Sequence, residues 1–199
     1  MEYSIHPALC ELERAFTFFN KELFSGELDS KVIITIQSRG RKAVLGWHWA
    51  GKWKNGKASL AEINLSAESL IQNDPYETLI HEMAHHLNHQ NGIRDVSDRQ
   101  YHNLHFKKAA EAAGLQVMKS GRAGYGITAL GELAKEKLLQ FKPERQVFEI
   151  LRIQETSRQI TKLKKWSCAC GVNVRVARAD FSATCNLCGS VFQLKDGGL

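Results

Sequence analysis

The ten residues Thr78–Leu87 read TLIHEMAHHL, and this stretch decides how the rest of the sequence is interpreted. On an α-helix, residues four apart share one face, so His81 and His85 would lie one turn above the other. Two imidazoles on one face can bind a single Zn²⁺ through their ring nitrogens. Glu82 follows the first histidine, where its carboxylate can reach a water on the metal instead of the metal itself. The motif H-E-x-x-H therefore predicts a zinc site with a base beside it.

The residues around the motif predict a helix with defined ends. Asp74 can serve as the N-cap, with Pro75 at the first helical position and Glu77 completing a capping box. Asn91 and Gly92 are typical of a helix end. The apolar stripe expected to face a core consists of Leu79, Ile80, Met83 and Leu87. Two histidines and a glutamate can also be ordinary surface residues, but this context favours the metal site.

The composition is that of a soluble globular protein, with 43% apolar and 24% charged residues among 199. This length accommodates one moderate domain and a small appendage. The formal net charge of +6 favours anionic partners, nucleic acid above all. No apolar run approaches the roughly 18 residues that a membrane helix needs, so we expect no membrane partner.

The beginning of the chain, Met1–Ser4, is polar and acidic, unlike a signal peptide. We therefore expect a cytoplasmic protein, in a compartment where thiols stay reduced. The five cysteines are then metal ligands or core residues instead of disulfide partners.

The elements before the motif are predicted from their apolar spacing. A helix is expected over Pro7–Phe24, and the Asn55-Gly56 pair predicts a hairpin turn. Strands are expected over Lys31–Gln37, Ala43–Trp49 and Ala61–Leu65. The order is one helix, three strands and then the H-E-x-x-H helix.

A catalytic zinc usually takes three protein ligands, so a third must come from elsewhere in the chain. His86 would point away around the helix, and His89 would lie too far along its axis. A second helix, ended by Gly114, follows a polar loop that can fold it back toward the first. The sequence leaves His102 and His105, at the start of that helix, as the candidates.

The combination of segments resembles the SprT-like family of zinc metallopeptidases. The resemblance covers roughly residues 10–115 and rests on FFNKELF at 18–24, INLS at 63–66, HEMAH at 81–85 and HNLHF at 102–106. The family's third ligand is a histidine in a segment resembling H-G-P-x-F. Residues 102–106 keep its His and Phe but lack its Gly and Pro.

The resemblance implies an α+β, zincin-like protease domain: a helix, a small antiparallel or mixed sheet, the H-E-x-x-H helix and a ligand helix. It implies His102 as the third ligand beside His81 and His85, with His105 as the fallback, and Glu82 as the general base of an endopeptidase. In the best-known members the substrates are proteins attached to DNA, which makes protein the expected substrate and DNA an expected partner.

The last forty residues contain a second metal motif. Cys168 and Cys170 are separated by 14 residues from Cys185 and Cys188, with a glycine after each pair. Four thiolates at this spacing can close a tetrahedral structural zinc site, and alternating valines at 172–177 predict a strand between the pairs. We expect a small β zinc ribbon, which also resembles bacterial SprT-like proteins, and hence two zinc ions per chain, one catalytic and one structural.

Two basic stretches predict contact with nucleic acid. Between residues 39 and 57 there is no acid, and basic side chains are interleaved with tryptophans that could stack on bases. The candidate contact residues are Arg39, Arg41, Lys42, Lys52, Trp53 and Lys54, with Lys162, Lys164 and Lys165 before and within the ribbon. The alternative is a solvated strand edge, with Trp47 and Trp49 packed on the core and His48 at the surface.

We therefore expect a protease domain over residues 1–120, a helical connector over 121–163 and a zinc ribbon over 164–199. In the connector, Gly121, Gly124 and Gly126 predict a loop, followed by helices at 128–141 and 144–165. The predicted function is zinc-dependent cleavage of proteins, including DNA-associated or DNA-crosslinked ones. One alternative is a nucleic-acid-binding regulatory protein whose H-E-x-x-H site is inactive or structural, and another is a narrow regulatory protease for which DNA is irrelevant. The sequence leaves the oligomeric state open.

Overall fold

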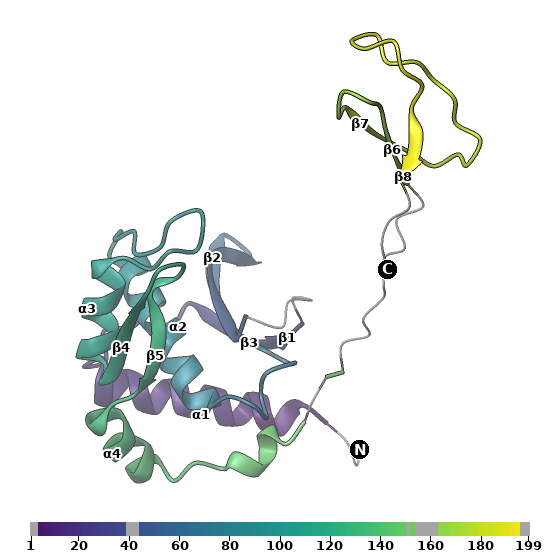
Figure 1. Ribbon diagram of the computed structural model, residues 1–199. Helices are drawn as coiled ribbons and strands as arrows, with labels where there is room; N and C mark the ends of the chain where they lie inside the picture. Colours follow the sequence, from purple (N-terminus) through teal and green to yellow (C-terminus); the bar gives the residue numbers. More distant parts are fainter. Residues whose placement is uncertain (1–3, 39–43, 151, 154–162, 196–199) are drawn as a thin grey trace. The chain divides into compact units, whose positions relative to one another are not determined.

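The computed structural model describes residues 4–38, 44–150, 152–153 and 163–195 (Figure 1). The chain divides into two compact units, Met1–Gln154 and Glu155–Leu199. Each unit is a body of its own with its own buried residues. Within the described ranges, no helix is long and apolar enough to cross a membrane.

The first unit mixes helices with two small sheets. In chain order its elements are α1 (His6–Leu23), β1 (Val32–Gln37), β2 (Gly46–Asn55), β3 (Ala58–Ser66), α2 (Pro75–Gln90), α3 (Leu104–Ala112), β4 (Leu115–Ser120), β5 (Gly124–Leu130), α4 (Glu132–Phe141) and a 3₁₀ helix (Arg145–Phe148). The α+β class and the order of helix, three strands and motif helix agree with the sequence prediction. The observed β2 runs six residues further than expected, from Trp49 to Asn55, and leads directly into the predicted hairpin turn.

The three-stranded sheet has the order β1-β3-β2, with β1 parallel and β2 antiparallel to β3. Directly opposed residues share a face, so His48 lies on the face of Ile63, and Trp47 on the face of Asn64. Ile63 is fully buried in the core that the sheet forms with the helices. The core face of β2 therefore carries the histidine, and the tryptophans lie on the other face.

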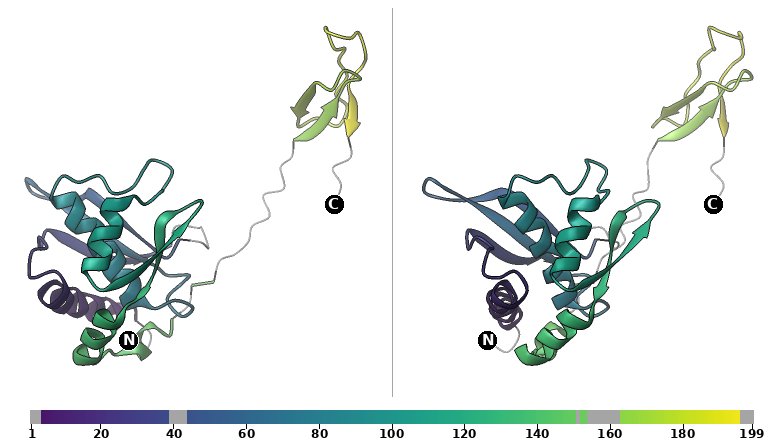
Figure 2. Two further views of the ribbon diagram at one scale, coloured as in Figure 1. Left: turned by 60° about the vertical axis from the view of Figure 1, so that its left-hand side comes forward. Right: turned by 90° about the vertical axis from the view of Figure 1, so that its left-hand side faces the viewer.

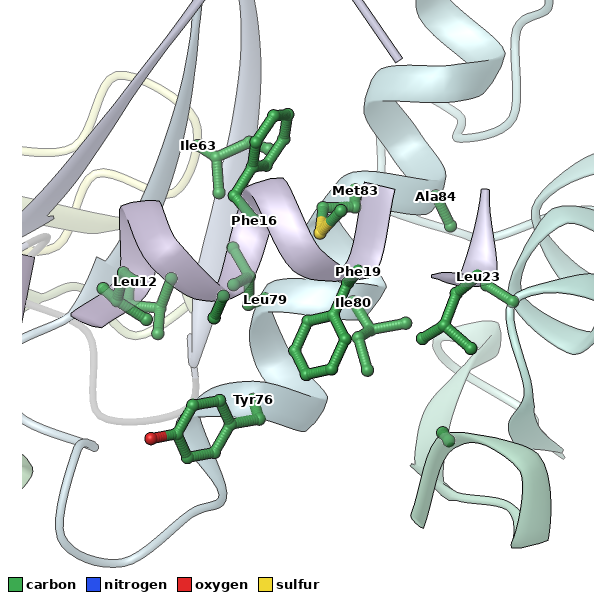
Figure 3. Packing of buried hydrophobic residues seen from close by; sticks show 14 of the residues in the cluster. Leu12, Phe16, Phe19, Leu23, Ile63, Tyr76, Leu79, Ile80, Met83 and Ala84 are labelled. Carbon is green, nitrogen blue, oxygen red and sulfur yellow. The ribbon is translucent and has the colours of Figure 1, made fainter. Parts of the chain in front are cut away.

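Helices α1 and α2 form the centre of the core (Figure 3). The expected apolar stripe of α2 is buried there, with Leu79, Ile80 and Met83 fully inaccessible and packed with Phe19 of α1. Burying an apolar side chain of this size contributes about 1.5–3 kcal/mol, so this stripe fixes which way the opposite face of α2 points. That opposite face carries the histidines.

The ends of α2 agree with the prediction, except for the capping box. The carboxylate of Asp74 accepts hydrogen bonds from the backbone N–H groups of Tyr76 and Glu77, which is the expected N-cap. The helix ends at Asn91, followed by Gly92 at a φ of +69°. The Glu77 side chain instead accepts a hydrogen bond from Thr128, so the predicted capping box was wrong.

The region after Gly114 differs from the predicted loop and long helices. β4 and β5 form an antiparallel hairpin beside α3 (Figure 2), and α4 begins only at Glu132. Residues 124–130 are therefore a strand, where a loop and the start of a helix were predicted. The described part of the second predicted helix, 144–165, contains the 3₁₀ turn Arg145–Phe148 and, at 164–165, the start of a strand. Residues 151 and 154–162 lie outside the described residues.

The second unit is a small three-stranded sheet, with strand order β7-β6-β8. Its strands are β6 (Lys164–Ser167), β7 (Asn173–Val176) and β8 (Gln193–Lys195). β7 confirms the strand predicted between the cysteine pairs. Among the residues that the structure describes, the buried cluster of this unit consists of Trp166, Cys168, Cys185 and Phe192, two of them cysteines, with partly buried apolar side chains packed against it.

Candidate metal centres and cleft

Three histidines from two elements meet in the first unit. His81 and His85 lie one turn apart on α2, and His102 joins them from the segment just before α3. Their candidate ligand atoms all lie within 4.8 Å of one another, and Nε2 of His85 is 3.1 Å from Nε2 of His102. His105, the fallback candidate, is exposed and does not belong to this group. The structure therefore brings His102, and not His105, together with His81 and His85.

His85 is oriented by a buried carboxylate. Its Nδ1 lies 2.7 Å from Oδ2 of Asp95, and the same oxygen accepts a hydrogen bond of 2.9 Å from Nδ2 of Asn88. Asp95 is only 6% exposed. Because the carboxylate accepts, Nδ1 carries the proton and Nε2 keeps its lone pair for a metal. The sequence analysis missed Asp95, which lies in the loop assigned only as polar.

The other two histidines are oriented in the same sense by different partners. Nδ1 of His102 lies 3.2 Å from the carbonyl oxygen of Ala123, and Nδ1 of His81 lies 3.2 Å from Oγ1 of Thr128. All three Nδ1 atoms thus have partners outside the group, which leaves the three Nε2 atoms for one shared point. This donor set suits Zn²⁺, which binds neutral imidazole nitrogens.

The pKa values of two of the three histidines, His81 and His102, agree with such a role. Burial lowers the pKa of His81 well below its usual value, and the charges of His85 and His102 add to this. Burial and the neighbouring His85 lower the pKa of His102 to about 4. Burial also opposes a charge on His85, but its hydrogen bond to Asp95 and the charges of Glu82 and Asp95 outweigh this and raise its pKa. His81 and His102 are therefore neutral near pH 7, as metal ligands must be.

Glycines pack directly against the side chains of His102 and Glu82. A Cβ on Gly126 would lie 2.5 Å from Nδ1 of His102, and a Cβ on Gly46 would lie 3.0 Å from Oε1 of Glu82. Gly124 has a φ of +61°, and a Cβ there would collide with the backbone oxygen of His102. These positions require glycine because no side chain fits. The sequence analysis interpreted Gly124 and Gly126 only as loop residues.

Glu82 and the histidines line an open cleft of about 1180 Å³. Its walls come from residues 44–50 at the start of β2, from α2, from the loop at 92–98 and from residues 126–128 of β5. Glu82 is 4% exposed and lies on the floor between β2 and the histidines. A carboxylate is thus held beside three convergent histidines, at the bottom of a space large enough for a chain segment.

His48 faces α2 instead of the solvent, so its predicted surface position was wrong. Its Nε2 lies 3.2 Å from Nδ1 of His86, whose Nε2 lies 3.0 Å from the backbone oxygen of Asp29. Burial lowers the pKa of His48 to about 3, with further contributions from His86, His85 and His89. A histidine that alternates with tryptophans on a strand is as consistent with a helix-facing position as with a solvent-facing one.

The basic stretch around β2 is only partly described. Arg39, Arg41 and Lys42 lie outside the described residues, as does Lys162 before the ribbon. Trp47 is 9% exposed, whereas Trp49 and Trp53 are 41% and 40% exposed, and Nζ of Lys52 lies 4.0 Å from the ring centre of Trp49. Of the two tryptophans expected on the core, only Trp47 is buried.

The four ribbon cysteines form the second group. Their sulfur atoms all lie within 4.8 Å of one another, with 3.2 Å between Cys168 and Cys170 and 3.7 Å between Cys170 and Cys185. Hydrogen bonds from the side chain and backbone of Ser190, followed by one from Cys170, lower the pKa of Cys188 to about 6. The glycines after the pairs, at positions 171 and 189, have φ values of +86° and +72°. This is the arrangement of a closed four-thiolate site.

The ribbon sheet also aligns basic side chains. Lys165 on β6 is directly opposite Arg175 on β7 and Lys195 on β8. Directly opposed residues share a face, so three positive charges form a row across all three strands. Like charges in this position destabilise a sheet, and an anionic partner would offset that cost.

Comparisons with curated proteins and with solved structures found no match. The model of the SprT-like family matches residues 12–125, more than half of the chain. The match includes α2 and His102 but ends before Gly126, Thr128 and the ribbon. On this evidence the chain belongs to the SprT-like family.

Proposed function

We propose that this protein is a zinc-dependent endopeptidase that holds a catalytic zinc with His81, His85 and His102. The observation that carries the proposal is the orientation of these histidines, whose Nδ1 atoms are all engaged elsewhere, beside Glu82 at the floor of a cleft. Membership of the SprT-like family is compatible with a metallopeptidase. The four ribbon cysteines would hold a second, structural zinc.

The residues divide the chemistry between them. Zinc, when bound, lowers the pKa of a coordinated water toward about 7 and polarises a carbonyl group. Glu82 accepts the proton of the attacking water and delivers it to the leaving amine. Gly46 leaves room for the Glu82 carboxylate, and the neutral imidazoles of His81 and His102 keep their Nε2 lone pairs available.

Protein is the proposed substrate because the cleft is large and open. Residues 44–50, around the start of β2, border it, as do residues 126–128 of β5, so two strands contribute walls beside the histidines. A space of about 1180 Å³ exceeds the usual pocket for a small molecule, about 300–1,000 Å³.

DNA is the proposed second partner, which makes DNA-associated or DNA-crosslinked proteins the proposed substrates. Trp49 and Trp53 are exposed on a basic hairpin, where they can stack on unpaired bases. The row formed by Arg175, Lys165 and Lys195 offers a surface for phosphates. The alternative is a DNA-binding regulatory protein with an inactive metal site, which the same surfaces would serve.

A digestion assay distinguishes the proposed endopeptidase from the regulatory protein with an inactive site. Casein and histone would be incubated with purified protein, with and without single-stranded DNA, beside the variant Glu82→Gln. The proposal expects cleavage by the wild type and none by the variant, with equal zinc content, because an amide cannot accept the water proton. A wild type that cleaves neither substrate under any of these conditions would favour the regulatory protein.

A further inference from the structure

A threonine hydroxyl connects one metal-site histidine to a carboxylate. Oγ1 of Thr128 lies 3.2 Å from Nδ1 of His81 and donates a hydrogen bond of 2.8 Å to Oε1 of Glu77. Glu77 and His81 are one helical turn apart on α2, whereas Thr128 comes from β5. Thr128, 47 residues after His81, thus bridges the side chains of Glu77 and His81.

The direction of this bridge follows from the number of protons available. An ionised carboxylate only accepts, so Thr128 uses its single proton toward Glu77. The hydroxyl oxygen then has only lone pairs for His81, and Nδ1 of His81 must be the donor. This leaves Nε2 of His81 without a proton, in the tautomer that a metal requires.

Glu77 lies in the first turn of α2, where the helix dipole stabilises a negative charge. Burial raises the pKa of Glu77, the hydrogen bond from Thr128 opposes this shift, and the charge of Asp74 adds to it. The Glu77 side chain accepts a hydrogen bond from Thr128 of β5 instead of forming the expected capping box within α2.

We propose that Thr128 and Glu77 are positioning residues that set the tautomer and ring orientation of His81 for metal binding. Neither residue is a candidate metal ligand. The inference rests on the proposed zinc site but extends beyond the family match, since Thr128 lies three residues past its end at residue 125. Position 128 therefore adds a determinant of metal affinity outside the matched segment.

The test is the affinity of the histidine site for Co²⁺, measured on the full chain by competition with a chelator. Ribbon-bound cobalt has sulfur-to-metal charge-transfer absorption, so the two sites can be followed separately. Thr128→Val removes the hydroxyl but keeps the β-branched shape that a strand favours. Thr128→Ser, the matched control, keeps the hydroxyl. Glu77→Gln tests the far end of the bridge with little change in volume.

We expect Thr128→Val to bind Co²⁺ at the histidines about 10–100-fold more weakly, with Thr128→Ser close to the wild type. Glu77→Gln should fall between them, because its amide can still accept from the threonine hydroxyl. Equal affinity of the wild type and Thr128→Val would overturn the inference and leave the zinc site in place. A wild type that binds no cobalt at the histidines would overturn the inference and the proposed function together.

Discussion

Gly126 lies so close to the imidazole of His102 that a Cβ at position 126 would be 2.5 Å from Nδ1. The same ring nitrogen contacts the carbonyl oxygen of Ala123 at 3.2 Å. The start of β5 therefore holds the ring of the third histidine by backbone alone, and any side chain at position 126 would have to displace that ring.

Gly126→Ala should weaken zinc binding at the histidine site, by about 10–100-fold if the loss resembles that of other supporting contacts. The measurement is zinc affinity by chelator competition, with circular dichroism as a check on folding. Gly121→Ala is the matched control, since a Cβ there has nothing within 4 Å. Equal effects of the two variants would show that the contact with His102 is unimportant.

His48 should make stability depend on pH. Its pKa is about 3 in the folded protein, against a usual value of 6.5. Between these values the unfolded chain binds one proton more, so this contribution is complete above pH 6.5 and is lost as the pH falls toward 3. One such proton gives a slope of about 1.4 kcal/mol per pH unit.

The variant His48→Gln removes that titration. The free energy of unfolding, measured by urea denaturation from pH 7.5 to 4.5 at matched zinc, should fall less steeply with decreasing pH in the variant than in the wild type. The comparison cancels the pH dependence that both proteins share. Parallel curves for the two proteins would mean that His48 titrates normally in the fold.

Removal of zinc from the ribbon should unfold the second unit but not the first. Among the described residues of the second unit, two of the four in the buried cluster are cysteines and the apolar side chains packed around them are only partly buried, so the unit should depend on metal to stay folded. Cys185→Ala should therefore lose one zinc per chain and the hydrogen-exchange protection of β6–β8, while α2 keeps its protection. Cys10→Ser, at an exposed cysteine on α1, is the control and should retain both zinc ions. Persistent protection of β6 in Cys185→Ala would contradict the prediction.

Trp53→Ala should reduce affinity for single-stranded DNA by roughly 1–3 kcal/mol, the usual contribution of one stacked base. Trp53→Phe keeps an aromatic face and should retain most of the affinity. Fluorescence anisotropy with a labelled oligonucleotide at two salt concentrations gives both the affinity and its salt dependence. If the wild type binds neither single- nor double-stranded DNA at low salt, the DNA part of the proposed function is wrong.

The sequence predicted what depends on local spacing. The bounds of α2, its N-cap at Asp74 and its buried stripe follow from residues within a few turns of each other. The pairing of β2 with β3 through Asn55-Gly56 is likewise a local signal. His102 needed the family resemblance, because spacing alone could not separate it from His105.

The sequence analysis failed where a residue's partner lies far along the chain. Glu77 satisfies a capping pattern, but Thr128 competes for its carboxylate from 51 positions away. β5 was merged with α4, since Leu130 and Leu133 suit a helical face and short apolar runs do not distinguish the two structures. The partner of His48, His86 on α2, lies 38 positions away and was equally beyond the reach of periodicity.

The hairpin of β4 and β5 has a consequence for the protein during its synthesis. A ribosome completes the H-E-x-x-H segment long before it adds Ala123, Gly126 and Thr128, the residues that orient His102 and His81. A nascent chain that ends before residue 124 thus carries the motif without two of its supports. If the histidines hold the proposed zinc, that ability is acquired late in translation, when the domain that surrounds the cleft is nearly complete.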